Sequence, residues 1–190
     1  VDHHYVQSRL RSLETQLNPH FLFNALNSIA ELIHQDPQKA ENAILKVSTF
    51  LRNTMAEKAQ ISLNDELRNV KDYVELENIR FSGKINFQNI GSLPNISIPK
   101  FSIQLLVENA IKHGFESNKE LNITLIYDQD INALVLKNDG KPIKTSKFGT
   151  GLSNLEQRLK LLCKGSIKIT DVQQPTFTIY LGDCNENITR

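Results

Sequence analysis

The sequence predicts an α+β protein in which a helical hairpin precedes a two-layer sandwich of helices on a mixed, mostly antiparallel sheet. From residue 5 to about residue 82, apolar side chains recur at spacings of three and four, the period of an amphipathic helix. From Gly83 onward, short segments of alternating apolar and polar residues lie between further amphipathic helices. Because these segments do not follow the strict order of βαβ units, a mostly antiparallel sheet is expected.

The first helical segment carries a coiled-coil seam that changes phase at Pro19. Four residues form the seam before the proline and four continue it afterwards: Val6, Leu10, Leu13 and Leu17, then Leu22, Leu26, Ile29 and Ile33. A proline inside a helix removes one hydrogen bond and clashes with the carbonyl four residues earlier. We therefore expect the helix to be kinked or loosened beside His20.

A second helix is expected after Asp36-Pro37, which ends the first. One face of this amphipathic helix is predicted to carry Ala40, Ile44, Val47, Phe50 or Leu51, and Met55. Two such helices bury little apolar surface alone. We therefore expect two chains to pair their hairpins into a four-helix bundle, which makes the protein a homodimer.

A third helix begins near Ser62, which with Asp65 has the spacing of a capping box, and runs to about Phe81. Its buried stripe is predicted to be Leu63, Leu67, Val70 and Val74. Further helices are expected at 101–115 and 149–163, and strands at 84–90, 122–128, 133–138, 167–172 and 177–181. We expect hairpins at 128–132 and between the last two strands. The chain thus divides into residues 1–60 and residues 61–190.

Composition and charge exclude several classes of function. The chain has 22 basic and 21 acidic residues and a net charge of +1, so no strong field favours direct nucleic-acid binding. Its longest apolar runs are far shorter than the roughly 20 residues that span a bilayer. Cys163 and Cys184 have neither metal-ligand spacing nor the pattern of a disulfide framework, so a reducing compartment and free thiols are expected.

The segment at residues 18–24, Asn-Pro-His-Phe-Leu-Phe-Asn, places His20 on the kinked helix. A neutral imidazole is a good nucleophile near pH 7. The alternative is an ordinary helix histidine that binds a backbone carbonyl, and His3, His4 and His34 keep that interpretation.

Residues 106–114 form the second segment of chemical interest. Asn109 and Lys112 are three residues apart, so they share one helix face, and Glu108 and His113 lie beside them. An amide oxygen and an ammonium suit Mg²⁺ and phosphate oxygens. The alternative is a polar surface stripe on a helix that packs against the sheet. That alternative explains Lys112 better than Asn109, because asparagine is a mediocre helix former.

Two turn-like segments complete the set. Residues 138–142, Asn-Asp-Gly-Lys-Pro, follow a strand and read equally well as a plain turn. Gly149 and Gly151 open a helix, where free backbone N–H groups and the helix dipole favour a phosphate. A short Gly-x-Gly is a weak signal alone, and it matches neither a Walker A loop nor a Rossmann fingerprint.

Together and in this order, the four segments resemble those of the LytS-type sensor histidine kinases, which share the Bergerat (GHKL) ATP-binding fold. The similarity covers nearly the whole chain. Residues 18–24 resemble the family's phosphoacceptor box, residues 106–114 its N-box, and residues 149–159 its second glycine box. The family's linker helix is matched by Tyr73, Glu77, Arg80 and Phe81.

The resemblance implies that residues 1–60 are the dimerisation and phosphotransfer helices, and that residues 61–190 are the catalytic ATP-binding domain. It makes His20 the phosphorylated residue, Asn24 a further catalytic residue and Asn109 the ligand of Mg²⁺. Lys112 and His113 would contact phosphate, residues 138–140 adenine, and Gly149 and Gly151 would lie in the closing loop. The nucleotide-binding set is Glu108, Asn109, Lys112, His113, Asn138, Asp139, Gly140, Gly149, Gly151 and Leu152.

The resemblance also implies partners and a location. The phosphate would pass to an aspartate of a response regulator, often one of the LytTR type. The chain would be the cytoplasmic region of a sensor anchored in the inner membrane, with the anchor in segments before Val1.

Several positions depart from the family pattern. The adenine box usually begins with Asp and has a second Gly, where this chain has Asn138 and Pro142. Phe21 stands where many histidine kinases have an acidic proton acceptor, and Leu105 stands where ATP-hydrolysing relatives of the fold have a carboxylate. Leu105 argues against a plain ATPase, and the phosphoacceptor segment argues against a serine kinase or anti-sigma factor. The main alternative is a degenerate kinase that acts as a dimeric regulatory scaffold.

Overall fold

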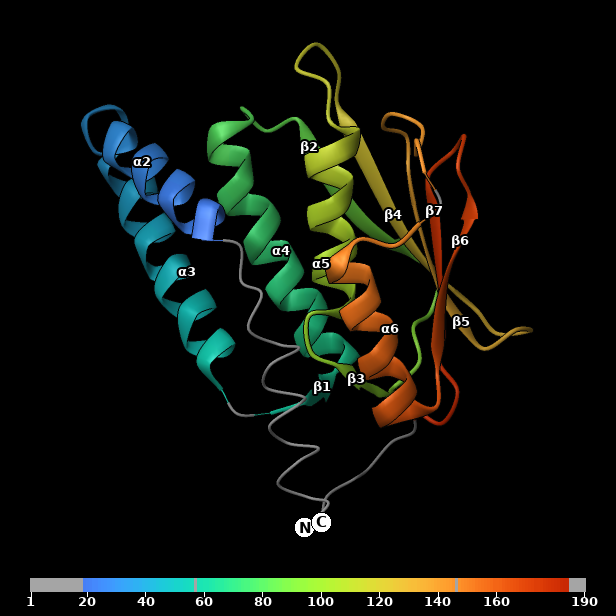
Figure 1. Ribbon diagram of the computed structural model, residues 1–190. Helices are drawn as coiled ribbons and strands as arrows, with labels where there is room; N and C mark the ends of the chain where they lie inside the picture. The colour runs from blue at the N-terminus through green and yellow to red at the C-terminus, as the bar shows by residue number, and fades with distance from the viewer. Residues whose placement is uncertain (1–18, 57, 146, 185–190) are drawn as a thin grey trace.

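The computed structural model describes residues 19–56, 58–145 and 147–184, so the predicted seam from Val6 to Leu17 and any bend before Pro19 lie outside the described residues. Figure 1 shows three layers. Helices α4, α5 and α6 cover one face of a five-stranded sheet, and the hairpin of α2 and α3 packs on the outer side of α4. None of the described helices is long and apolar enough to cross a membrane.

The hairpin consists of α2 (Pro19–Gln35) and α3 (Pro37–Met55), which meet at Asp36 as predicted. The Asp36 carboxylate caps α3 by accepting a hydrogen bond from the backbone N–H of Lys39 at 3.0 Å. The buried face differs in part from the predicted one and consists of Phe21, Ala25, Ile29, Ala40, Ala43, Val47 and Phe50. Leu26 and Ile33 of the predicted seam, and Ile44 and Met55 of the predicted apolar face, are exposed in the single chain.

Helix α4 (Leu63–Arg80) begins and packs as predicted. The Ser62 hydroxyl accepts a hydrogen bond from the N–H of Asp65 at 3.1 Å, and the stripe Leu63, Leu67, Val70 and Val74 is buried. The Tyr73 ring lies 4.7 Å from that of Phe21, measured between centroids, and Phe21 lies 5.0 Å from Phe50. This aromatic cluster joins α4 to the hairpin, so both halves of the chain share one core. The boundary at residue 60 stays a prediction.

The five-stranded sheet has the order β2-β4-β5-β7-β6. Its strands are β2 (Ile85–Ile90), β4 (Leu121–Asp128), β5 (Ala133–Asn138), β6 (Ser166–Asp171) and β7 (Thr176–Tyr180). Only the β2–β4 pair is parallel, and β4–β5 and β6–β7 are the predicted hairpins. The sheet is therefore mixed and mostly antiparallel, as predicted. A separate ribbon of β1 (Gln60–Ser62) and β3 (Ser97–Pro99) was not predicted, because three-residue strands carry no readable alternation.

The helix predicted at 101–115 is two elements. The α-helix α5 (Ser102–Asn109) continues directly into a π-helical turn, η1 (Ala110–Gly114). Such π turns are rare and often occur at functional sites. Helix α6 (Thr150–Cys163) begins one residue later than predicted, with Gly149 as its N-cap.

The expectation of free thiols was wrong. Cys163 and Cys184 form a disulfide, with their Cα atoms 4.8 Å apart and both residues buried. Cys163 ends α6 and Cys184 follows β7, so the two meet only because the sheet brings these elements together. A sequence separation of 21 residues gives no sign of that meeting.

Candidate functional site

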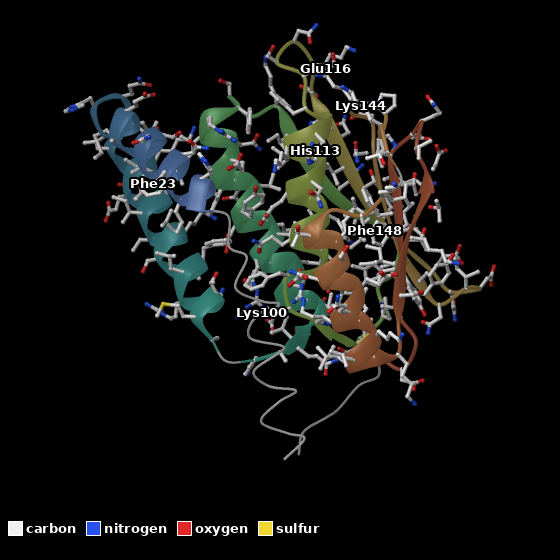
Figure 2. The ribbon with its side chains drawn as sticks, viewed as in Figure 1. Phe23, Lys100, His113, Glu116, Lys144 and Phe148 are labelled. Atoms are coloured by element: carbon white, nitrogen blue, oxygen red, sulfur yellow. A yellow bond between two sulfur atoms is a disulfide. The ribbon has the colours of Figure 1, made fainter. Side chains whose placement is uncertain are left out.

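A cavity of about 590 Å³ lies between the end of α5, the π turn, the loop before α6 and the strands β6 and β7. The predicted binding residues that line it are Asn109, Lys112, His113, Asn138, Gly149, Gly151 and Leu152. Segments from three distant parts of the sequence therefore meet at one place. In Figure 2, His113 lies on the π turn and Phe148, another lining residue, lies where α6 begins.

The lining of this cavity is cationic. Lys112, Lys141, Lys144 and Lys147 line it together with His113, and none of its described lining residues is acidic. Burial, and next the charge of Lys112, lower the pKa of His113, so its imidazole is largely neutral near pH 7. Such a cavity attracts an anionic ligand.

Sequence reasoning missed Lys141, Lys144 and Lys147. Their regular spacing of three, between two predicted binding segments, was the available signal. It was easy to overlook because the chain as a whole is almost neutral.

The floor of the cavity is built around Asn138 at the end of β5. Asn138 is 3% exposed, and its Oδ1 accepts a hydrogen bond from the N–H of Gly140 at 3.1 Å. A Cβ atom at Gly140 would lie only 2.7 Å from the Cα and the carbonyl oxygen of Gly114. Lys141 N–H also donates to Gly114 C=O at 3.1 Å. Glycine at position 140 is therefore needed for the close approach of the β5 turn to the end of the π turn.

Asp139 and Gly140 do not line the cavity. The Asp139 carboxylate accepts hydrogen bonds from the backbone N–H of Asn122 at 2.8 Å and from its Nδ2 at 2.7 Å. Asp139 thus fixes the end of β5 against β4. Gly140 supports the position of Asn138.

The N-terminus of α6 opens on the cavity through Gly149 and Gly151. The first N–H groups of a helix lack intrahelical partners, and the helix dipole is positive at this end, so an anion is stabilised there. A Cβ at Gly151 would lie 3.2 Å from Leu105 Cδ1. Leu105 therefore packs against the start of α6, and an apolar contact occupies the place where ATP-hydrolysing relatives of the fold carry a carboxylate.

Glu108 lies beside the cavity without lining it. Its carboxylate accepts a hydrogen bond from Gln104 Nε2 at 2.9 Å. Burial raises its pKa to about 7, and the nearby charges of Glu77 and Glu66 act in the same direction. Glu77, from the predicted linker-helix motif, forms an ion pair with Arg80 at 2.7 Å, and Arg80 lies 4.3 Å from the centre of the Phe81 ring.

His20 and Asn24 lie on α2, away from the cavity. His20 is exposed and Asn24 is partly buried. Helix α4 lies between α2 and α5 (Figure 1). The structure therefore brings the predicted nucleotide-binding residues together, but it does not bring the predicted phosphoacceptor to them within the single chain.

Comparisons with known proteins show what the chain is similar to. The histidine kinase family model matches residues 8–85. The sensor protein LytS of Staphylococcus haemolyticus is 34% identical over 173 residues, which is 80% of this chain and 30% of that protein. The sensor protein LytS of Streptococcus mutans is 33% identical over 175 residues, which is 82% of this chain and 30% of that protein.

A solved structure shares the fold. It is the Acinetobacter baumannii histidine kinase AdeS, with a TM-score of 0.50 at 16% identity, and the match covers 82% of this chain and 84% of that one. The chain spans about 30% of the length of the curated relatives it matches. Over about four fifths of its length the chain is therefore similar to the LytS sensor proteins, and residues 8–85 match the histidine kinase family model.

Proposed function

We propose that this chain transfers the γ-phosphoryl group of ATP to His20 and then to an aspartate of a response regulator. The observation that carries the proposal is the cationic cavity. Lys112, Lys141, Lys144 and Lys147 surround a helix N-terminus there, with Asn138 on the floor. Four ammonium groups and free backbone N–H groups suit a triphosphate better than a neutral ligand.

We propose that adenine binds at Asn138 and the phosphates at Lys112, His113 and the start of α6. Asn109 also lines the cavity. We propose its amide oxygen as a ligand of Mg²⁺, which commonly takes few protein ligands and completes its shell with phosphates and water. The bound ion would neutralise phosphate charge during transfer.

The transfer step follows from the chemistry of imidazole. An unprotonated ring nitrogen of His20 attacks the γ-phosphorus, the bond to the β–γ bridging oxygen breaks, and ADP leaves. The other ring nitrogen gives up its proton to solvent. Catalysis of such a reaction is mostly positioning and charge stabilisation. Because His20 lies outside the cavity, the hairpin must move, or a second chain must supply the histidine.

We propose a homodimer built on the α2–α3 hairpin. Its outer surface carries five large apolar side chains that are 46% to 67% exposed: Phe23, Leu26, Ile33, Ile44 and Leu45. An exposed apolar surface of this kind is typical of an interface. We further propose a response regulator of the LytTR type as recipient, and a cytoplasmic location below a membrane anchor that precedes Val1. These last two proposals rest on the family resemblance.

The test is autophosphorylation with γ-labelled ATP and Mg²⁺, comparing the unaltered chain, His20→Gln and His34→Gln. His34 lies on the same helix and is exposed, so its substitution is the matched control. We expect acid-labile, base-stable label in the unaltered chain and in His34→Gln, and none in His20→Gln. Label that persists in His20→Gln would assign the phosphoacceptor elsewhere. Bound ATP without any transfer would support the scaffold.

A further inference from the structure

Lys100, which follows β3, is a buried lysine at the end of the helical hairpin. It is 2% exposed, and its ammonium group donates hydrogen bonds to the carbonyl oxygens of Thr54 at 3.0 Å and Ala56 at 2.8 Å. Thr54 is in the last turn of α3 and Ala56 is its C-cap. A cation at this position stabilises a helix C-terminus and binds carbonyls that lack intrahelical partners. Lys100 therefore holds the end of the hairpin onto the rest of the chain.

Arg158 binds the same lysine from the other side. Its guanidinium Nη1 donates a hydrogen bond to the backbone carbonyl of Lys100, and Arg158 is 3% exposed. Arg158 belongs to α6, the helix whose first residues line the cavity. It is also part of the glycine-box segment at 149–159. Only the first residues of that segment have a proposed role in nucleotide binding. The carbonyls of α3, Lys100 and α6 thus form one continuous chain of contacts.

Glu66 of α4 connects α5 to this junction. One carboxylate oxygen accepts a hydrogen bond from the N–H of Phe101 at 3.0 Å, and the other accepts from Ile103 at 2.9 Å and Gln104 at 3.1 Å. Glu66 is fully buried, and the positive charge of Arg158 stabilises its carboxylate. The start of α5, the end of α3 and the body of α6 are therefore held by Glu66, Lys100 and Arg158.

The junction contacts the start of α5 and the middle of α6, whereas the cavity is lined by the other end of α5 and by the start of α6. Helix α5 runs from Ser102, beside Lys100, to Asn109 at the cavity. Helix α6 runs from Gly149 at the cavity to Arg158, which is nine residues or about 13 Å along a helix. Figure 2 shows Lys100 low in the molecule and His113 far above it. A shift at the end of α3 can therefore be transmitted through these contacts to both helices that line the cavity.

We propose that Lys100 and Arg158 are positioning residues that couple the end of the phosphoacceptor hairpin to helix α6, and so set the placement of His20 relative to the nucleotide. This rests on the proposed kinase function. A purely structural role would explain burial and pairing as well. It would not explain why the two contacts join the hairpin to the helix that opens on the nucleotide cavity. Since transfer depends on near-attack geometry, a loosened junction should impair transfer more than nucleotide binding.

The variants are Lys100→Met, which keeps the apolar stem, Lys100→Arg, which keeps donors for the two carbonyls, and Arg158→Met. Lys160→Met is the matched control, because Lys160 is exposed on α6. The readouts are the Kd for ATP and the rate of His20 labelling at saturating ATP, per nucleotide-binding site. We expect Lys100→Met and Arg158→Met to bind ATP within about twofold of the unaltered chain and to label at least about tenfold more slowly. Lys100→Arg should recover much of that rate.

Equal labelling rates in all folded variants would overturn the proposal, and so would a parallel loss of ATP binding and rate. If the unaltered chain binds ATP but labels no histidine, the kinase function fails instead. A second measurement does not depend on variants or on transfer. By reciprocity, a non-hydrolysable ATP analogue with Mg²⁺ should slow amide hydrogen exchange at residues 50–56 if the cavity and the end of α3 are coupled. Unchanged exchange there, with the analogue bound, would overturn the coupling.

Discussion

At the scale of single residues, the proposed recognition of adenine depends on Asn138. Its Oδ1 is directed at Gly140 and accepts that residue's N–H at 3.1 Å. Asn138 lines the cavity while it is 3% exposed, so little of the side chain remains for a ligand. A carboxylate has two acceptor oxygens, whereas an amide has one oxygen and one donor group. The single amide oxygen of Asn138 therefore accepts the hydrogen bond of the turn at residues 138–140. It leaves no second side-chain oxygen to accept a hydrogen bond from the adenine amine.

The substitution Asn138→Asp should strengthen ATP binding. One carboxylate oxygen can bind Gly140 N–H while the other accepts a hydrogen bond from the adenine amine. A charge-assisted bond of this kind should lower the Kd for ATP roughly tenfold, or by about 1.4 kcal/mol. GTP is the control ligand, because guanine presents a carbonyl at the same ring position and should gain nothing. Competition with a fluorescent nucleotide measures both. Tighter binding of GTP as well would mean that the added charge acts without reading the base.

At the scale of elements, α4 combines a regular apolar stripe with buried acids. Glu66 and Glu77 are both buried on this helix. Glu66 binds the start of α5 and Glu77 pairs with Arg80. Burial raises the pKa of each carboxyl, against the opposing effects of the hydrogen bonds and arginine charges. A sequence pattern based on apolar periodicity would place both acids on the surface, so the structure was needed to find them.

The raised pKa of Glu77 gives stability a definite pH dependence. The folded state holds this proton more tightly than the unfolded state, so the free energy of unfolding should fall as pH rises from the unfolded pKa of about 4.5 through the folded value. Glu77→Gln keeps an acceptor for Arg80 and should flatten that decline. Urea unfolding between pH 4.5 and pH 8 measures it, with the exposed Glu156→Gln as control. A slope that Glu77→Gln leaves unchanged would show that the decline comes from other groups.

At the scale of the whole molecule, most of the fold follows from periodicity. The predicted limits of β5 match the structure, and those of β4 and α6 differ by one residue. Two of the features that the sequence did not reveal depend on contacts between segments distant in sequence. Cys163 meets Cys184 only in the folded sheet, and Lys100 meets Thr54 and Arg158 only at the junction. The predicted nucleotide-binding residues were easier to find, because helix ends and turns supply most of them locally.

The pairing of two hairpins is the largest feature that the structure of a single chain does not determine. Leu26 and Ile33 share one face of α2, and Ile44 and Leu45 lie exposed on α3, while the opposite faces of both helices are buried against α4. Leu26 and Ile33 are the predicted seam residues that are exposed in the single chain. A partner chain in the proposed dimer would cover them. These exposed residues give the hairpin a second apolar face, as a four-helix bundle requires.

Two substitutions on that face, Leu26→Asp and Leu45→Asp, should therefore separate the dimer without unfolding the chain. Each places a charge where a dimer would bury it, which is costly without a partner, whereas in the monomer the site is open to water. Sedimentation equilibrium should show at least about a tenfold weaker association. Leu161→Asp is the control, since Leu161 is an equally exposed apolar residue on α6, at 51%. If Leu161→Asp weakens the dimer and the hairpin variants do not, the chains pair through the sandwich. His20 would then have to reach the cavity within its own chain.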